Sequence, residues 1–211
     1  METVNRILQE KITARIAPNK AVLIFGARRV GKTVMMRKIV DNYSGRTMML
    51  NGEDYDTLAL LENRSIANYR HLLDGIDLLA IDEAQNIPQI GSILKLIVDE
   101  IPGISVLASG SSSFDLLNKT GEPLVGRSTQ FSQREIAQTE TALETRQNLE
   151  ARLIYGSYPE VVMMENYERK TDYLRDIVGA YLLKDILAID GLKNSSKMRD
   201  LLRLIAFQLG S

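Results

Sequence analysis

Two short segments of the chain carry residue types that could bind and cleave a nucleoside triphosphate. The first fits the P-loop pattern G-x-x-x-x-G-K-[ST] and directly follows an apolar run of strand length, residues 21–25. Glycines allow close approach of the backbone to phosphate, and the first N–H groups of the helix predicted over Val34 to Val40 have no partner within that helix. We therefore predict a nucleotide-binding loop made of Gly26, Ala27, Arg28, Arg29, Val30, Gly31, Lys32, Thr33 and Val34.

Two side chains of this loop have distinct expected roles. Lys32 would reach the β- and γ-phosphates, and the Thr33 hydroxyl would ligate Mg²⁺. The alternative is a glycine turn that precedes an ordinary amphipathic helix. The strand before the loop and the helix after it favour nucleotide binding, because the motif functions only in that context.

The second segment is an apolar run that ends in two carboxylates, Leu78-Leu79-Ala80-Ile81-Asp82-Glu83. Such a run is typical of a parallel strand buried on both faces, and in a P-loop protein it has the Walker B pattern. Asp82 would hold Mg²⁺, mostly through a water, and Glu83 would orient or deprotonate the attacking water. Alone, the run could equally be a strand before a solvated acidic turn, but the P-loop upstream favours Walker B.

Serines follow the strand predicted at residues 104–108. Ligands of open parallel sheets sit beyond the carboxyl ends of the strands, so the hydroxyl of Ser109 or Ser111 could sense the γ-phosphate. Serines also make good helix N-caps, a role that suits Ser112 or Ser113 better. We take Ser109 as the candidate sensor, with capping as the alternative for this segment.

Arg127 ends a turn-rich loop, residues 121–127, and is the leading candidate for an arginine that stabilises charge on the transferred phosphate. It could act in its own chain or across an interface with a neighbour. The alternative is a surface arginine without such a role. Arg28 and Arg29, inside the P-loop, compete for any phosphate or partner contact.

Strand-length apolar runs alternate with helical stripes over the first two-thirds of the chain. The predicted strands are 21–25, 47–51, 78–81, 104–108 and 128–131. The predicted helices are 4–16, 34–40 and 90–101, and residues 55–73 are expected to form either one helix or two. Alternation predicts an α/β fold whose parallel sheet is covered on both faces. One strand intervenes between the P-loop strand and the Walker B strand. We therefore expect a P-loop NTPase of the additional-strand class, with a five-stranded sheet in the order 5-1-4-3-2.

The pattern changes after about residue 145. Residues 145–155, 167–189 and 195–209 are helical by period and length, and no further strand is convincing. We therefore expect an ATPase domain at residues 1–145 and a small helical region at 146–211, the possible start of a further domain. The last helix carries Lys197, Arg199 and Arg203, which suits either nucleic-acid contact or, because Asp200 interrupts the charge, a solvated face.

Composition restricts the other classes of function. The chain has 211 residues and a net charge of -1, so no general attraction to polyanions is implied. It contains no cysteine and one histidine, which excludes disulfides, thiolate metal sites and histidine metal clusters. No signal peptide or membrane-length apolar run is evident, so we expect a cytoplasmic protein without a membrane partner. Asn118-Lys119-Thr120 is followed by Gly121 in place of the aspartate that would pair with guanine, so ATP is the expected nucleotide.

The sequence resembles the prokaryotic AAA-type ATPases whose C-terminal half is a conserved domain of unknown function. The resemblance rests on the double arginine of the P-loop and on the segments 81–88, 109–112, 124–127, 131–135, 155–160 and 183–186. These cover most of the chain in the family's order. The family usually has proline where Ala27 stands, and its members continue well beyond residue 211, so this chain resembles their N-terminal ATPase part. The resemblance implies ATP binding and hydrolysis without a defined physiological substrate.

The sequence-based hypothesis is a Mg²⁺-dependent ATPase that is coupled to an unknown partner, with a monomer and a homo-oligomer as the two open alternatives. In it, Lys32 neutralises charge, Thr33 and Asp82 hold the metal, Glu83 activates water and Ser109 senses the γ-phosphate. The main alternative is a nucleotide-gated switch that binds DNA or protein with little turnover. A nucleotide kinase, which shares the P-loop, is disfavoured because the acidic pair suits attack by water.

Overall fold

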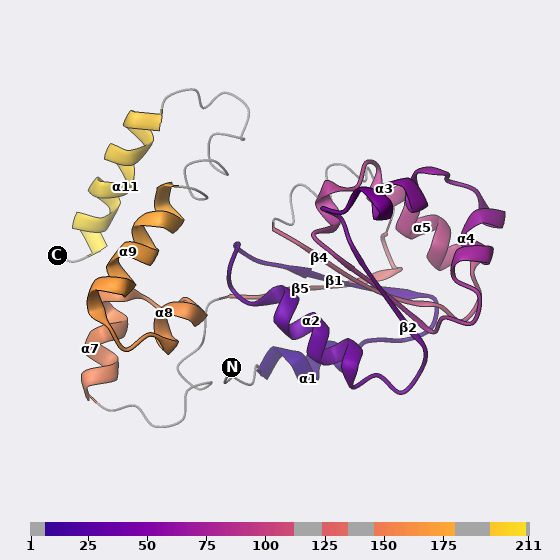
Figure 1. The fold of residues 1–211 in the computed structure, drawn as a ribbon, viewed down its shortest axis with the longest axis horizontal. Coiled ribbons are helices and arrows are strands. Elements are labelled where there is room, and N and C mark those ends of the chain that lie inside the picture. The colour runs from indigo at the N-terminus through magenta and orange to yellow at the C-terminus, as the bar shows by residue number, and fades with distance from the viewer. Residues whose placement is uncertain (1–6, 112–123, 135–145, 180–194, 210–211) are drawn as a thin grey trace. The chain divides into compact units, whose positions relative to one another are not determined.

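The computed structural model describes residues 7–111, 124–134, 146–179 and 195–209 (Figure 1). The chain divides into two compact units, Met1–Leu143 and Glu144–Ser211, each of which has its own architecture. The predicted helix start at residue 4, the proposed caps Ser112 and Ser113 and the segment 183–186 lie outside the described residues.

The first unit is built on a five-stranded sheet. Its strands are β1 (Lys20–Phe25), β2 (Thr47–Asn51), β3 (Leu78–Asp82), β4 (Ser105–Gly110) and β5 (Ser128–Ser132). Every pairing is parallel and the order is β2-β3-β4-β1-β5, so the predicted order is confirmed when the sheet is followed from its other edge. β4 is longer than predicted: Ser109 pairs with Ile24 and Gly110 with Phe25, which places Ser109 inside the strand rather than after it.

Helices cover both faces of this sheet. They are α1 (Ile7–Thr13), α2 (Lys32–Asp41), α3 (Tyr55–Glu62), α4 (Ile66–Leu72) and α5 (Ile90–Glu100), with a short 3-10 helix at Ala84–Asn86. Side chains of a strand alternate between faces, and the core divides accordingly. Val22 and Ile24 of β1 pack with α1 and α2, whereas Leu23 and Phe25 pack in the cluster formed with α3, α4 and α5.

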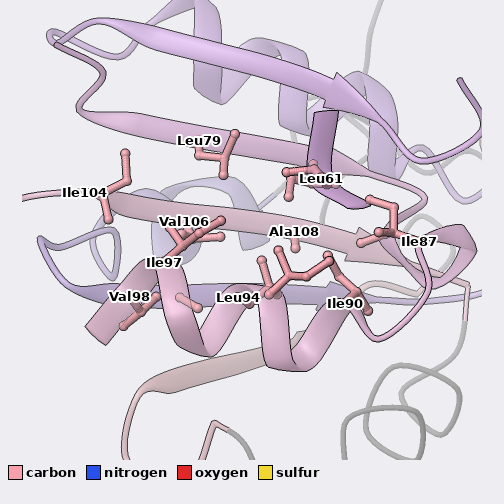
Figure 2. Close-up of a cluster of buried hydrophobic side chains, with 14 of the residues drawn as sticks. Leu61, Leu79, Ile87, Ile90, Leu94, Ile97, Val98, Ile104, Val106 and Ala108 are labelled. Carbon is pink, nitrogen blue, oxygen red and sulfur yellow. The ribbon is translucent and has the colours of Figure 1, made fainter. Parts of the chain in front are cut away.

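The core beneath α5 explains why the predicted helical stripe is apolar on one side. Figure 2 shows Ile90, Leu94 and Ile97 directed at the sheet, where Val106 and Ala108 of β4 lie. All of these side chains are fully buried. Burial of such side chains contributes about 1.5–3 kcal/mol each relative to exposure, so this face fixes the sheet that carries the candidate site.

A buried tyrosine joins α3 to α4. Tyr69 is 0% exposed, and its hydroxyl donates to the carbonyl oxygen of Leu61 at 2.9 Å. Burial raises the pKa of the Tyr69 phenol above its usual value, because the charged phenolate would lose its hydration. The two helices meet through this bond rather than continuing as a single helix, one of the two arrangements that the sequence left open for residues 55–73.

The described residues of the second unit form helices and the turns between them, with no strand. Its helices are α7 (Arg146–Tyr155), α8 (Pro159–Met163), α9 (Tyr167–Ile177) and α11 (Ser195–Leu209). Tyr155 and Tyr167 stack with their ring centroids 5.7 Å apart, and the Lys170 ammonium lies 5.8 Å from each centroid. On α11, Arg203 lies 3.6 Å from Asp200, and both side chains are exposed.

Candidate nucleotide-binding and hydrolysis site

The predicted phosphate-binding loop connects the buried strand β1 to helix α2 (Figure 1). Two of its residues have left-handed backbone conformations, Arg29 at φ 63° and Gly31 at φ 91°. Gly31 is the N-cap of α2, so the helix begins at Lys32 and its first N–H groups face the loop. Val30 is fully buried and anchors the loop, whereas Val34 is 48% exposed. This arrangement suits an anion held by backbone N–H groups.

Gln133 donates hydrogen bonds to both the end of β1 and the P-loop, contacts that the sequence did not predict. Its backbone N–H donates to Phe25 O at 2.6 Å, and its side-chain Nε2 donates to Val30 O at 2.8 Å. A Cβ at Gly26 would overlap the carbonyl oxygen of Gln133, so the first glycine of the motif is required by this neighbour. Two signals pointed to this residue: it follows the strand predicted at residues 128–131, and it belongs to segment 131–135 of the family resemblance.

The Lys32 side chain folds back and bonds to the backbone of the P-loop that precedes it. Only 4% of the residue is exposed, and Nζ donates to Gly26 O and Ala27 O, both at 2.9 Å. A buried ammonium requires such partners, because an unpaired buried charge is expensive. Its positive charge is therefore concentrated at the centre of the loop, where the sequence predicts the phosphates.

Three elements bring oxygen atoms together next to this loop. The Thr33 hydroxyl at the start of α2 donates to Asp82 Oδ2 at 2.6 Å. Asp82 is the last residue of β3, and its other oxygen, Oδ1, accepts from the Ser109 hydroxyl of β4. Asp82 is 6% exposed and Ser109 is 0% exposed. The structure thus places Lys32, Thr33, Asp82 and Ser109 at one edge of the sheet, beyond or within the carboxyl ends of neighbouring strands.

Glu83 adopts a left-handed conformation, φ 48°, immediately after β3. For a residue with a Cβ this conformation costs about 1–2 kcal/mol, so its surroundings must stabilise it. Its N–H lies 3.1 Å from Asp82 Oδ1 and 3.2 Å from Ser109 Oγ. Gly52, just past β2, donates to Asp82 O at 2.8 Å, and a Cβ at Gly52 would overlap the carbonyl oxygen of Glu83. Strained backbone of this kind is concentrated at functional sites.

The Glu83 carboxylate is itself hydrogen-bonded. Gln85 Nε2 donates to Glu83 Oε2 at 2.5 Å, and Gln85 Oε1 accepts from the Ser111 N–H at 3.3 Å. Gln85 is 7% exposed and belongs to the 3-10 helix that follows β3. Sequence reasoning assigned no role to Gln85, because one of its two partners, Ser111, follows a different strand.

The structure does not bring Arg127 to these residues. Arg127 directly precedes β5, and its carbonyl oxygen accepts from Ala21 N at 2.9 Å at the amino ends of the strands. The P-loop lies at their carboxyl ends. The Arg127 side chain instead forms a 2.5 Å ion pair with Asp99 of α5, with 42% and 29% of the two side chains exposed. Within the P-loop, Arg29 is exposed and Arg28 is partly buried.

The fold and the arrangement of these residues define a P-loop NTPase of the additional-strand class. Residues 18–142 match the family model described as an AAA domain, and residues 146–211 match one described as a domain of unknown function, DUF8612. The first match spans more than half of the chain, so the chain belongs to the AAA domain family. This membership places it among the ATP-binding P-loop ATPases and confirms the family resemblance.

Known proteins and structures agree with this fold. An uncharacterized protein of Methanocaldococcus jannaschii is 20% identical over 219 residues, which cover 95% of this chain and 49% of that protein. The chain thus spans about half the length of the curated relative it matches. A Walker-type ATPase of Pyrococcus abyssi superposes with a TM-score of 0.56 at 12% identity, covering 89% of this chain and 75% of that structure. That likeness concerns the fold alone.

Among the residues that the structure describes, no helix is both long enough and apolar enough to cross a bilayer.

Proposed function

We propose that this chain binds ATP with Mg²⁺ and hydrolyses it by attack of water on the γ-phosphorus. The single observation that carries the proposal is the convergence of Lys32, Thr33, Asp82 and Ser109 at the mouth of a P-loop whose backbone suits phosphate. Residues 1–145 would form the ATPase domain, and residues 146–211 the helical region that follows it.

The expected mode of phosphate binding rests on the oxygen atoms that Lys32 contacts when no nucleotide is bound. Two carbonyl oxygens hold its ammonium at 2.9 Å, and both belong to the loop itself. A phosphate oxygen carries a formal negative charge that a carbonyl oxygen lacks, so the ammonium gains the attraction of an ion pair in addition to the hydrogen bond. We therefore expect the β- and γ-phosphates to attract Lys32 from these carbonyls while the N–H groups at the start of α2 hold the other oxygens.

The donor set next to the loop fits Mg²⁺. The hydroxyl of Thr33 and the carboxylate of Asp82 lie 2.6 Å apart, and both are hard oxygen ligands. Mg²⁺ in phosphoryl-transfer sites is held by one or two such groups together with substrate phosphates and waters. When bound, the ion supplies positive charge to the phosphate oxygens.

In the proposed reaction, Glu83 accepts a proton from the attacking water. The water oxygen forms a bond to the γ-phosphorus as the bond between that phosphorus and the bridging oxygen breaks, which releases ADP and inorganic phosphate. Lys32 stabilises the charge that develops on the β- and γ-phosphates. The Ser109 hydroxyl donates to Asp82 and lies 3.2 Å from the Glu83 N–H. In the proposal it would sense the γ-phosphate and link it to these two acidic residues.

The test is phosphate release from ATP in the presence of Mg²⁺, with ATP binding measured in parallel at several protein concentrations. We expect turnover by the intact chain and none by Lys32→Ala. Arg37→Ala is the matched control, because it removes one exposed positive charge from the same helix, and it should retain turnover. Turnover per molecule that rises with concentration would indicate that self-association completes the site. Equal turnover in Lys32→Ala and the intact chain would exclude the proposal.

The same experiment separates the alternatives. ATP binding without turnover would instead support a nucleotide-gated switch, in which occupancy changes the affinity for a protein or DNA partner. Phosphate that appears on an added nucleoside acceptor would support a kinase.

A further inference from the structure

A buried amide bridges the Glu83 carboxylate and the segment that follows β4. Gln85 donates to Glu83 Oε2 at 2.5 Å and accepts from the Ser111 N–H at 3.3 Å, with 7% of the residue exposed. The nitrogen of the Gln85 amide thus bonds to Glu83, the proposed water-activating residue. Its oxygen bonds to Ser111, two residues after the proposed phosphate sensor Ser109.

The bond to Glu83 is stronger than a typical side-chain contact. A hydrogen bond to a carboxylate is charge-assisted, because the acceptor carries a negative charge. Because Gln85 is buried, its amide cannot turn to solvent without losing both partners. A free glutamate side chain samples several rotamers, so this contact restricts the Glu83 carboxylate to one direction.

The end of β4 and the residue that follows it thus contact Glu83 at two points. The hydroxyl of Ser109, inside β4, lies 3.2 Å from the Glu83 backbone N–H. Ser111, the first residue after β4, reaches the Glu83 carboxylate through Gln85. Ser109 also donates to Asp82, so the end of β4 is linked to both members of the acidic pair.

We propose that Gln85 is a positioning residue for hydrolysis, which sets the direction of the Glu83 carboxylate relative to the segment after β4. The inference rests on the proposed ATPase function and adds a residue that acts through Glu83 without touching the nucleotide. A positioning residue changes kcat and leaves ATP affinity unaltered, because Glu83 acts on the water in the transition state and not on bound ATP.

The experiment is a double-mutant cycle in the full chain with Gln85→Met, Glu83→Gln and both together. Methionine keeps an unbranched chain of similar length without the amide. We expect Gln85→Met to lower kcat about tenfold or more, a part of the 10²–10⁴-fold that a positioned general base contributes. Its KM and its affinity for ATP should stay close to those of the intact chain, and thermal unfolding checks that the variant is folded under the assay conditions. In the Glu83→Gln background, the same change should cause no further loss.

Asn86→Met is the matched control. It removes an amide from the next residue of the same 3-10 helix, where the side chain is exposed, and should leave kcat unchanged. Gln85→Asn provides a second variant if methionine prevents folding. It keeps the amide but is one methylene shorter, so it should also lower kcat.

Three results would overturn the inference while leaving the ATPase proposal intact: an unchanged kcat in both Gln85 variants, a loss of ATP affinity at constant kcat, or an equal loss in the presence and absence of the Glu83 carboxylate. No turnover by the intact chain would instead defeat the ATPase proposal, and the role of Gln85 with it.

Discussion

Polar side chains at the carboxyl ends of the strands have different partners from those at the amino ends. We call these two borders of the sheet the carboxyl-end edge and the amino-end edge. At the carboxyl-end edge, side chains bond to one another: the hydroxyls of Thr33 and Ser109 both donate to the Asp82 carboxylate. At the amino-end edge, polar side chains bond mainly to backbone. Lys20 Nζ, for example, donates to Gly126 O at 2.8 Å. The same strands thus support two kinds of polar contact, separated by the length of a strand.

Asn19 illustrates the second kind. Its Nδ2 donates to Val98 O at 3.0 Å and to Ile101 O at 3.2 Å, and its Oδ1 accepts from Gly103 N at 3.1 Å. These bonds join the start of β1 to the turn between α5 and β4. Asn19 has φ 57°, a conformation that asparagine tolerates better than most residues. Its role is to close a turn.

This difference in partners distinguishes polar side chains that stabilise the fold from polar side chains that are proposed to bind a ligand. The bonds of Asn19 satisfy backbone groups of a turn that must be satisfied whether or not a ligand binds. The hydroxyl of Thr33 and the carboxylate of Asp82 bond to each other, and a metal ion could replace that bond by binding both oxygens. The carboxyl-end edge therefore carries the proposed chemistry, although both edges are polar.

The largest expected effect comes from removing the charge of Glu83. Glu83→Gln keeps the shape of the side chain but removes the proposed proton acceptor, so turnover should fall by about 10²–10⁴-fold. ATP affinity should remain, since Lys32 and the loop are unchanged. Phosphate release and equilibrium ATP binding measure the two quantities. Unaltered turnover in this variant would remove Glu83 from the mechanism.

Two serines of β4 allow the edges to be compared within one strand. Ser109→Ala removes the donor to Asp82 at the carboxyl end and should lower turnover about tenfold, the equivalent of roughly 1.4 kcal/mol. Ser105→Ala is the control at the amino end. Ser105 is 1% exposed and its hydroxyl has no hydrogen-bond partner among the described residues, so its removal should preserve both turnover and stability. Similar losses in the two variants would contradict the distinction between the edges.

If Asn19 only stabilises the fold, its replacement should lower the free energy of unfolding and leave the turnover of ATP unchanged. Asn19→Ala removes its side-chain bonds and places alanine in a left-handed conformation, which should lower the free energy of unfolding by about 1–3 kcal/mol. Asn19→Gly loses the bonds but relieves the conformational cost, so it should be less destabilising. Denaturant titration measures both variants. Reduced turnover of the folded protein would show that the amino-end edge also affects the reaction.

The smallest expected effect is that of Arg127→Ala. An exposed ion pair contributes about 0.2–1 kcal/mol, so stability should change little. Turnover at low protein concentration should be that of the intact chain, because this arginine lies at the edge opposite the P-loop. A loss confined to high concentration would indicate that Arg127 acts across an interface between chains. A loss at all concentrations would contradict its structural placement.

Sequence reasoning identified the strands, their order and the two main motifs, because each depends on local patterns. Unbroken apolar runs mark strands buried on both faces, and the P-loop motif requires a strand and a helix on either side. Even so, the boundary of β4 was misplaced by two residues at its end, because Ser109 and Gly110 are held in the strand by pairing with β1 rather than by their own propensity.

The sequence by itself determined which chemistry this chain could carry, since Lys32, Thr33, Asp82 and Glu83 belong to motifs with a fixed spacing. Only the tertiary structure decided what supports them. Gln133 beneath the P-loop, Gly52 against Glu83, Gln85 between two strand ends and Arg127 at the opposite edge all depend on contacts between segments far apart in the chain. A polar residue shows its partners only when the fold brings them within hydrogen-bond distance, and no sequence spacing encodes that distance.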